Sequence, residues 1–409
     1  MSGAYQNGAR SAAMLLVAML AAASPILKAD DTGKADREGD WSLAFRYRLE
    51  TVDQDSFARD ATASTLRSRL AYQSGERQGF SVFAELDYIA ELFADDYNAG
   101  AGNTPGRTQY PVVADPDGAD LNQAFVQYRH GDNRFRAGRQ RIIFDNARFI
   151  GNVGWRQNEQ TYDAVSFSRP GNHGLKFTLA YVDNVNRIFG DDVSAGDHEQ
   201  QTYLANFGKA FEGVGTLTVY WYDIDNEDAP ALSNTTRGLR FTGSRAAARG
   251  PFGYTLEFAR QSENGGPVDF NANYYRLDLS AGLGAATLYG GFESLEGDKD
   301  LAGQAFRTPL ATLHAFNGWA DMFLATPGAG LEDAFAGLKG KAGAWTWGVL
   351  YHDFSAQSGS MDYGSELDLS LSRKLAERYG LLLKAARFDA DNPAYTDTTK
   401  LWLQLSAEY

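Results

Sequence analysis

A strict alternation of apolar and polar residues is the feature that most restricts the fold of this chain. Between Trp41 and Leu49 every second residue is large and apolar, whereas Arg46 and Arg48 fall on the opposite face. Such a segment is typical of a β-strand with one apolar and one polar face. The pattern recurs in segments of about ten residues, which is the length that a tilted membrane strand requires.

Eighteen such segments follow one another along the sequence. They start near residues 41, 62, 79, 121, 134, 162, 174, 201, 215, 235, 251, 272, 285, 332, 344, 364, 380 and 398. Short and long links alternate between them, and the long links carry acidic runs. The pattern predicts an all-β fold, a transmembrane antiparallel up-and-down barrel of about 18 strands with short periplasmic turns and long acidic outer loops. A soluble sandwich or propeller is the alternative.

The two ends of the chain indicate export to the bacterial outer membrane. Residues 1–23 combine one cation, Arg10, with an apolar run too short to span a bilayer as a helix, which is typical of a signal peptide. We expect residues 24–40 to be an N-terminal periplasmic segment and residues 41–409 to form the barrel, surrounded by outer-membrane lipid. The closing segment ends at Tyr409 in the form that outer-membrane assembly machinery reads.

Composition and motifs exclude several classes of function. The 409 residues contain no cysteine, which excludes disulfides, thiolate metal sites and cysteine nucleophiles, and the net charge of −14 disfavours nucleic acid as a partner. No motif for a cofactor, a metal or an enzyme is present, so we predict no catalytic residue. An enzyme of the outer-membrane phospholipase kind is the rival class, but the alternation around His352 turns that side chain toward the lumen.

Arginine on the lumen-facing side is the most informative feature for function. Ten arginines are assigned to the lumen on this basis: Arg46, Arg48, Arg67, Arg69, Arg129, Arg136, Arg139, Arg141, Arg240 and Arg276. The first eight belong to the first five strands and would form a cationic strip that attracts anions. The alternative is that they pair with inward carboxylates and brace the wall. Arg136 and Arg139 both face inward only if Gly138 marks a bulge.

The sequence resembles the alginate export family of outer-membrane proteins. The resemblance is carried by GRQRIIFDNARFIGNVGWRQNEQTYDAV from Gly138, by GFESLEGD from Gly291, and by TPLATLHAFNGWADMFLATPGAGLEDAF from Thr308, which we place in a long outer loop. It implies a monomeric 18-stranded barrel whose arginine-rich lumen passes a polyanionic polysaccharide. Within the first motif, the resemblance to the family is best at Arg139 and Arg141. It also adds Arg156, in the loop after the fifth strand segment, to the predicted substrate path.

We therefore predict an outer-membrane channel for facilitated diffusion of anionic solutes or of an alginate-like polysaccharide. The alternative is a general or substrate-specific porin for small organic acids whose arginines mainly brace the barrel wall. Large loops folded into the lumen would favour small solutes, whereas an open bore with a continuous arginine track would favour a polymer.

Overall fold

The computed structural model describes residues 39–409 except 172–173, 249 and 267–268. In this part of the chain there are 18 β-strands and three short 3₁₀ helices, η1 (Pro105–Arg107), η2 (Pro230–Leu232) and η3 (Leu313–Ala315). The predicted signal peptide, residues 1–23, lies outside the described residues, as do residues 24–38 of the predicted periplasmic segment.

The strands follow one another along the whole described chain. Their bounds are β1 (Asp40–Gln54), β2 (Ala61–Gln73), β3 (Phe80–Asp96), β4 (Gly118–His130), β5 (Asn133–Gln140), β6 (Thr161–Arg169), β7 (Leu175–Asn186), β8 (Asp197–Phe211), β9 (Gly215–Ile224), β10 (Asn234–Arg245), β11 (Phe252–Ser262), β12 (Asn271–Leu283), β13 (Ala286–Leu295), β14 (Leu331–Ala342), β15 (Trp345–Ser355), β16 (Asp362–Ala376), β17 (Tyr379–Ala390) and β18 (Thr398–Glu408).

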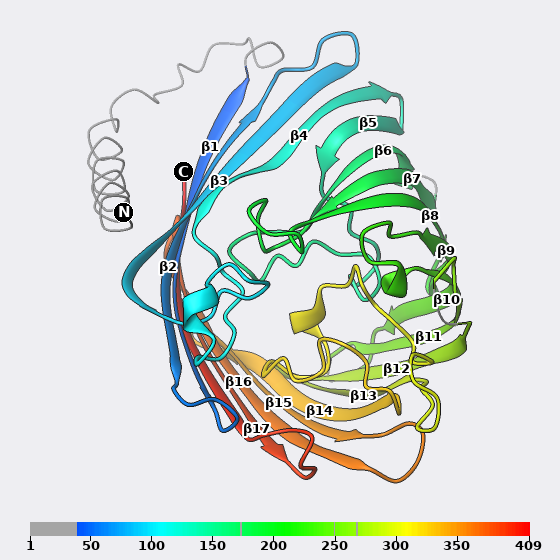
Figure 1. Ribbon diagram of the computed structural model, residues 1–409. Helices are drawn as coiled ribbons and strands as arrows, with labels where there is room; N and C mark the ends of the chain where they lie inside the picture. Colours follow the sequence, from blue (N-terminus) through cyan, green and yellow to red (C-terminus); the bar gives the residue numbers. More distant parts are fainter. Residues whose placement is uncertain (1–38, 172–173, 249, 267–268) are drawn as a thin grey trace.

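The strands form one closed antiparallel barrel (Figure 1). Each strand pairs with its neighbours in sequence, and β1 pairs with β18 from Ala44 opposite Glu408 to Gln54 opposite Thr398. Closure leaves no sheet edge with unpaired backbone groups, which a membrane requires. The fold prediction is confirmed, because every predicted segment begins within four residues of an observed strand.

Alternation divides each strand into an outer apolar face and an inner polar face. On β12, Tyr275, Leu277 and Leu279 are exposed on the outside, whereas Arg276 lies inside the barrel. A soluble protein would bury such a band, so the exposed band is a surface for lipid. Among the described residues, no helix is long and apolar enough to cross a membrane.

Aromatic rings form a belt on the outer face near the short turns of β3 to β8. Its members are Phe80, Tyr128, Phe135, Phe167, Phe177 and Phe207. The rings of Phe80 and Tyr128 are 4.6 Å apart and those of Phe135 and Phe167 are 4.4 Å apart. Aromatic belts of this kind mark the boundary between lipid and water in membrane barrels.

The last residue completes the closing strand pair. Tyr409 donates its backbone N–H to the carbonyl of Leu43 at 2.8 Å and accepts one from Leu43 at 3.1 Å. Its ring lies edge-on to Phe45, with centroids 6.4 Å apart. The C-terminal tyrosine is therefore part of the β1–β18 seam; its use by the assembly machinery remains a prediction.

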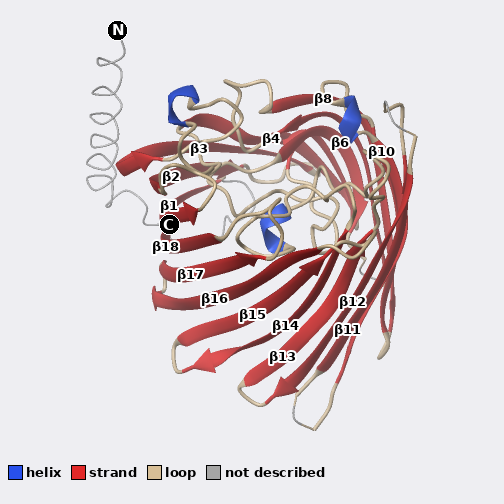
Figure 2. Ribbon diagram, turned by 60° about the horizontal axis from the view of Figure 1, so that its bottom comes forward, coloured by secondary structure: helices blue, strands red, loops and turns tan. Residues whose placement is uncertain are grey.

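Three long connections turn back into the barrel (Figure 2). These lumen loops are residues 97–117, 141–160 and 296–330, three of the predicted long links. Of the two arrangements that the sequence left open, an open bore or loops folded into the lumen, the structure has the second. The physical reason is an apolar core inside the barrel, where Phe149 contacts Tyr220, Tyr274 and Phe306 with ring centroids 5.1 to 5.8 Å apart. Burial of each such ring contributes about 1.5–3 kcal/mol, which favours the inward position.

We expect a charge on the outer face to destabilise the barrel and a charge one residue further along to be tolerated. Leu279→Arg should lower the free energy of unfolding by about 2–4 kcal/mol, because arginine is then held in hydrocarbon. Ser280→Arg lies at the same depth but faces the lumen, and it should cost less than half as much. Urea unfolding in lipid vesicles measures both values. Equal losses would contradict the assignment of the two faces.

Candidate substrate path in the lumen

The lumen loops reach across the barrel and bind the opposite wall. In loop 141–160, the Arg156 guanidinium donates to Glu50 on β1 at 3.1 Å. In loop 296–330, Asp321 accepts from Lys400 on β18 at 2.9 Å, and the backbone N–H of Ala320 donates to Glu366 on β16 at 2.8 Å. These contacts fix loops that begin on distant strands, so the loops occupy the lumen.

The loops also bind one another. Ile150 and Leu310 form an isolated parallel bridge, and the N–H of Gly151 donates to the carbonyl of Leu310 at 2.8 Å. Loop 97–117 joins them through Asp115, which accepts from the backbone N–H of Gln157 at 2.7 Å. The three loops therefore behave as one inserted unit.

An arginine–carboxylate cluster connects this unit to the first strands. We define it as Arg46, Arg48, Arg67, Arg69, Arg141 and Arg156 with Glu50, Glu85, Asp87, Asp115, Glu159 and Asp321. Six arginines thus face six carboxylates, and Lys400, which also pairs with Asp321, adds a seventh cation. Arg46 makes no ion pair in the described part, but it donates to Gln157 and to the carbonyls of Gly154 and Arg156. The cluster is close to neutral, although it consists largely of the predicted arginine strip.

Glu159 lies at the centre of this cluster. It pairs with Arg69 at 2.8 Å, with Arg67 at 3.7 Å and with Arg141. Burial favours the neutral acid, but Arg69 and Arg141 outweigh that effect and lower the pKa of Glu159 to about 2. The carboxylate is therefore charged at neutral pH and holds loop 141–160 against β2.

The remaining predicted arginines lie apart from the cluster. Arg129 is half-exposed beside Glu76 near a short turn, at 3.4 Å. Arg240 pairs with Glu257 at 2.7 Å on the far wall. Arg136 faces the lumen, where it donates to Gln127 at 2.9 Å and makes no ion pair within the described residues.

Gly138 carries no bulge in the two ladders of β5. Pairing with β4 and with β6 runs through it without a shift in register, so Arg136 and Arg139, three positions apart, lie on opposite faces. Arg139 shares its face with the exposed Phe135 and pairs with Asp163 at 2.9 Å. The condition for Arg139 to face inward is therefore not met, and the structure corrects its assignment to the lumen.

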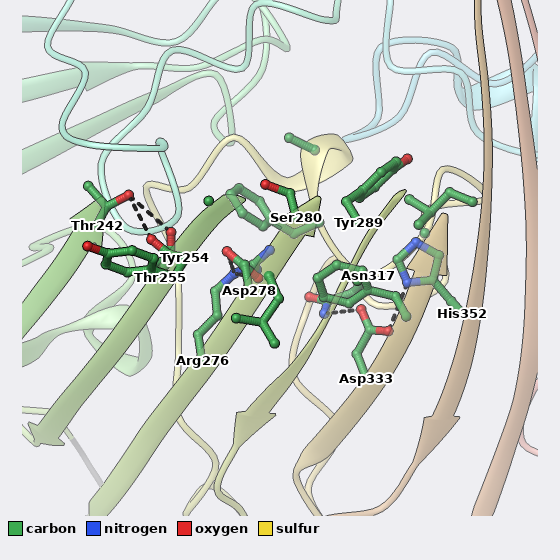
Figure 3. Close-up of a pocket in the computed structure, with 18 of the residues that line it drawn as sticks. Thr242, Tyr254, Thr255, Arg276, Asp278, Ser280, Tyr289, Asn317, Asp333 and His352 are labelled. Atoms are coloured by element: carbon green, nitrogen blue, oxygen red, sulfur yellow. Dashed lines mark hydrogen bonds and ion pairs between the residues drawn. The ribbon is translucent and has the colours of Figure 1, made fainter. Parts of the chain in front are cut away.

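A cavity of ≈ 370 Å³ remains between loop 296–330 and the wall of β10 to β15. Figure 3 shows that Arg276, Asp278, Ser280 and Tyr289 project from strands, while Asn317 comes from the loop. The Arg276 guanidinium lies 5.3 Å from the ring of Phe316 and 5.4 Å from that of Phe335. The cavity thus offers a cation, hydroxyl groups and aromatic faces to a small solute.

Three lumen-facing lysines that the sequence analysis missed lie between this cavity and the short-turn end of the barrel. Lys339 stands over the ring of Tyr289 at 4.8 Å, and Lys341 and Lys374 line a second hollow near the short turns. None of the three makes an ion pair in the portion of the chain that the structure describes. The same alternation that identified the arginines places Lys339 and Lys341 inward, so a search not restricted to arginine would have found them.

Residues 39–266 match the protein-family model described as alginate export, which is more than half of the chain. The chain belongs to the alginate export family. The matched residues contain β1 to β11, including loops 97–117 and 141–160. The motifs at 291–298 and 308–335 lie beyond the match; the second of them forms much of lumen loop 296–330. Comparison with curated protein sequences found no match.

This alginate export barrel is also similar to solved outer-membrane structures. The crystal structure of OccAB4 from Acinetobacter baumannii matches with a TM-score of 0.72 and 12% identity, covering 92% of this chain and 100% of that one. The outer-membrane protein opdK from Pseudomonas aeruginosa matches with a TM-score of 0.68 and 13% identity, covering 90% and 99%. At such identities the likeness shows the fold alone.

The protein is thus a bacterial outer-membrane channel barrel of the alginate export family. His352 faces the lumen as expected, and its Nδ1 lies 2.8 Å from Asp333. In the described portion, no three histidine, aspartate or glutamate side chains gather as a metal site.

We expect Glu159→Gln to destabilise the barrel at neutral pH but not at pH 2. A carboxylate whose pKa falls from 4.5 to about 2 on folding stabilises the protein above pH 4.5 and loses this contribution as the pH falls to about 2. The variant should therefore lose about 3 kcal/mol of unfolding free energy at pH 7. Glu263→Gln, in an outer loop without an ion pair among the described residues, is the control. If the loss of unfolding free energy in Glu159→Gln stays constant down to pH 2, the charge of the Glu159 carboxylate is not the source of the stabilisation.

Proposed function

We propose that this barrel is a channel for facilitated diffusion of small anionic solutes, carboxylate-bearing organic acids in particular. The observation that carries the proposal is the inserted unit of three lumen loops, bound to each other and to the wall. It supports the small-solute alternative of the sequence analysis over a wide conduit for a polymer.

The size of the remaining space supports small solutes. A cavity of ≈ 370 Å³ falls within the range of about 300–1,000 Å³ that small-molecule sites occupy. Its hydroxyl groups and aromatic rings suit a hydroxylated or aromatic acid, and Arg276 supplies a planar donor for a carboxylate. Arg276 is itself bound to Asp278 and Glu293, so it contributes recognition more than net charge.

The arginine–carboxylate cluster supports wall bracing as the main role of the first-strand arginines. Its charges nearly cancel, and buried arginines with fixed carboxylate partners are poor attractors for a passing anion. Arg46 and Lys384 also lack ion pairs within the described chain, but both are buried under the lumen loops. The positive field of the path comes instead from cations without ion pairs on the turn side of the lumen, Arg136 on one wall and Lys339, Lys341 and Lys374 on the other. These residues lie between the cavity and the turn-side opening, where anions would be concentrated.

Export of a polyanionic polysaccharide is the second candidate, and membership of the alginate export family favours it. A polymer would require a continuous bore, so the lumen loops would have to leave the barrel during transport. Direction and cargo would then differ from those of the small-solute channel, whereas the barrel would be the same.

We expect the unpaired lysines to determine ion preference. Reversal potentials across a planar bilayer under a salt gradient should show anion preference in the wild type and its loss in Lys339→Gln/Lys341→Gln/Lys374→Gln, because the lumen loses three uncompensated charges. Arg240→Gln/Glu257→Gln removes a buried pair without changing net charge, and it should leave the reversal potential unchanged. A cation-selective wild type, or an unaltered triple variant, would refute the anion path.

A further inference from the structure

Lys384 on β17 is a buried lumen-facing lysine enclosed by three tryptophans. Its Nζ lies 3.6 Å from the ring centre of Trp319, 4.1 Å from Trp155 and 5.3 Å from Trp402. Trp319 belongs to loop 296–330, Trp155 to loop 141–160 and Trp402 to β18. We call these three rings the tryptophan box. One wall cation therefore contacts the tips of two separate lumen loops.

A directed chain of hydrogen bonds extends from the box into the loops. Lys384 Nζ donates to Nε2 of His314 at 2.8 Å, so this nitrogen is the acceptor and Nδ1 carries the hydrogen. Nδ1 then donates to Asp321 at 2.8 Å, and Asp321 also binds Lys400 at 2.9 Å. Burial lowers the pKa of His314 to about 3, which keeps the imidazole neutral in this arrangement.

The surroundings of Lys384 are unusual for a buried ammonium. No carboxylate of the described chain lies within ion-pair distance of it; the more distant charged groups that face it are Asp368, Asp321, Glu50 and Arg48. Cation–π contact and the His314 hydrogen bond must therefore offset the loss of water, and both become stronger in a dry site. If Lys384 only filled space, a methionine of similar length could replace it without loss of contacts.

The loop tip beside the box is held in an unfavourable backbone conformation. Asn317 and Asp321 have φ of 55° and 61°, in the left-handed region, on either side of Trp319. In loop 141–160, Val153 has φ of 49°, which is rarer still for a β-branched residue. Such conformations persist only where external contacts hold them, and the contacts with Lys384 are next to both.

We propose that Lys384 is a positioning residue that holds both loop tips in the lumen and thereby sets the size limit of the channel. It acts through the tryptophan box and the His314–Asp321 chain and needs no direct contact with the solute. The proposal rests on the lumen being a conduit, as proposed above, but it concerns the size of the solute and not its charge.

The test measures which sizes of poly(ethylene glycol) enter the pore and lower its conductance in planar bilayers. Lys384→Met keeps the length of the side chain but removes the donors and the cation, so the loop tips should be released. We expect larger polymers to enter and single-channel conductance to rise several-fold. Lys384→Arg retains a cation and donors and should restore the wild-type limit.

Lys339→Met is the matched control, because it removes a lumen lysine that stands over one ring, Tyr289, and makes no hydrogen bond or ion pair with a lumen loop among the described residues. It should alter ion preference and leave the size limit unchanged. Trp319→Leu breaks the same box from the loop side and should reproduce Lys384→Met.

Heat-modifiable gel mobility establishes that each variant forms a barrel before its pore is measured. If Lys384→Met does not assemble, Trp319→Leu decides the question. A wild-type size limit in either assembled variant would overturn the proposal, as would failure of Lys384→Arg to restore the limit. If neither variant assembled, Lys384 would serve barrel folding and the proposal would be wrong. Loss of anion preference with an unchanged size limit would leave the channel proposal intact and refute only this inference.

Discussion

Every charge that the lumen loops bury inside the barrel has to be compensated there, and the arrangement of the lumen follows from this constraint. An uncompensated buried charge costs several kcal/mol, so loop 141–160 can lie inside only where partners meet it. Arg156 forms an ion pair with Glu50, and Glu159 forms ion pairs with Arg67, Arg69 and Arg141. Arginine suits this role because its planar group binds several oxygens at fixed angles.

The same constraint explains how an acidic protein keeps an arginine-rich wall without becoming strongly cationic inside. The wall arginines hold the loops through ion pairs. In the proposed function, the ion preference therefore depends on a few lumen cations that have no ion-pair partner in the described part of the chain. The loops in turn add an apolar core around Phe149 and Phe306, of the kind found in soluble domains. The lumen is therefore packed and partly apolar toward the long-loop end of the barrel. Between Tyr289 and the short turns it is polar and basic.

The sequence predicted the barrel well because its signal is local. Alternation and the short turns are visible within about twenty residues, and counting the segments along the chain gave the number of strands. Alternation also predicted the inward direction of Arg46, Arg69, Arg276 and His352, which contact lumen loops or line the lumen cavity. The position of the loops could not be predicted, since it depends on partners such as Arg156 and Glu50 that are more than 100 residues apart. For Arg69 the bracing alternative already predicted an inward carboxylate as partner, and Asp87 on the neighbouring strand is one. Glu159 is 90 residues away in a lumen loop, so alternation could not identify it as the second partner. At Gly138 neither ladder of β5 has a bulge, so Arg139 faces outward.

Solute size tests the central claim most directly, because the loops either stay in the lumen during transport or leave it. The measurement is flux into liposomes that contain the purified wild-type barrel, with uronate chains of increasing length as solutes. Loops that remain bound to the wall predict rapid entry of single acids, a steep fall within the first few sugar units, and no flux of long chains. Flux of long polyanions at a rate near that of the single acids would contradict the account and would show that the inserted unit is displaced during transport.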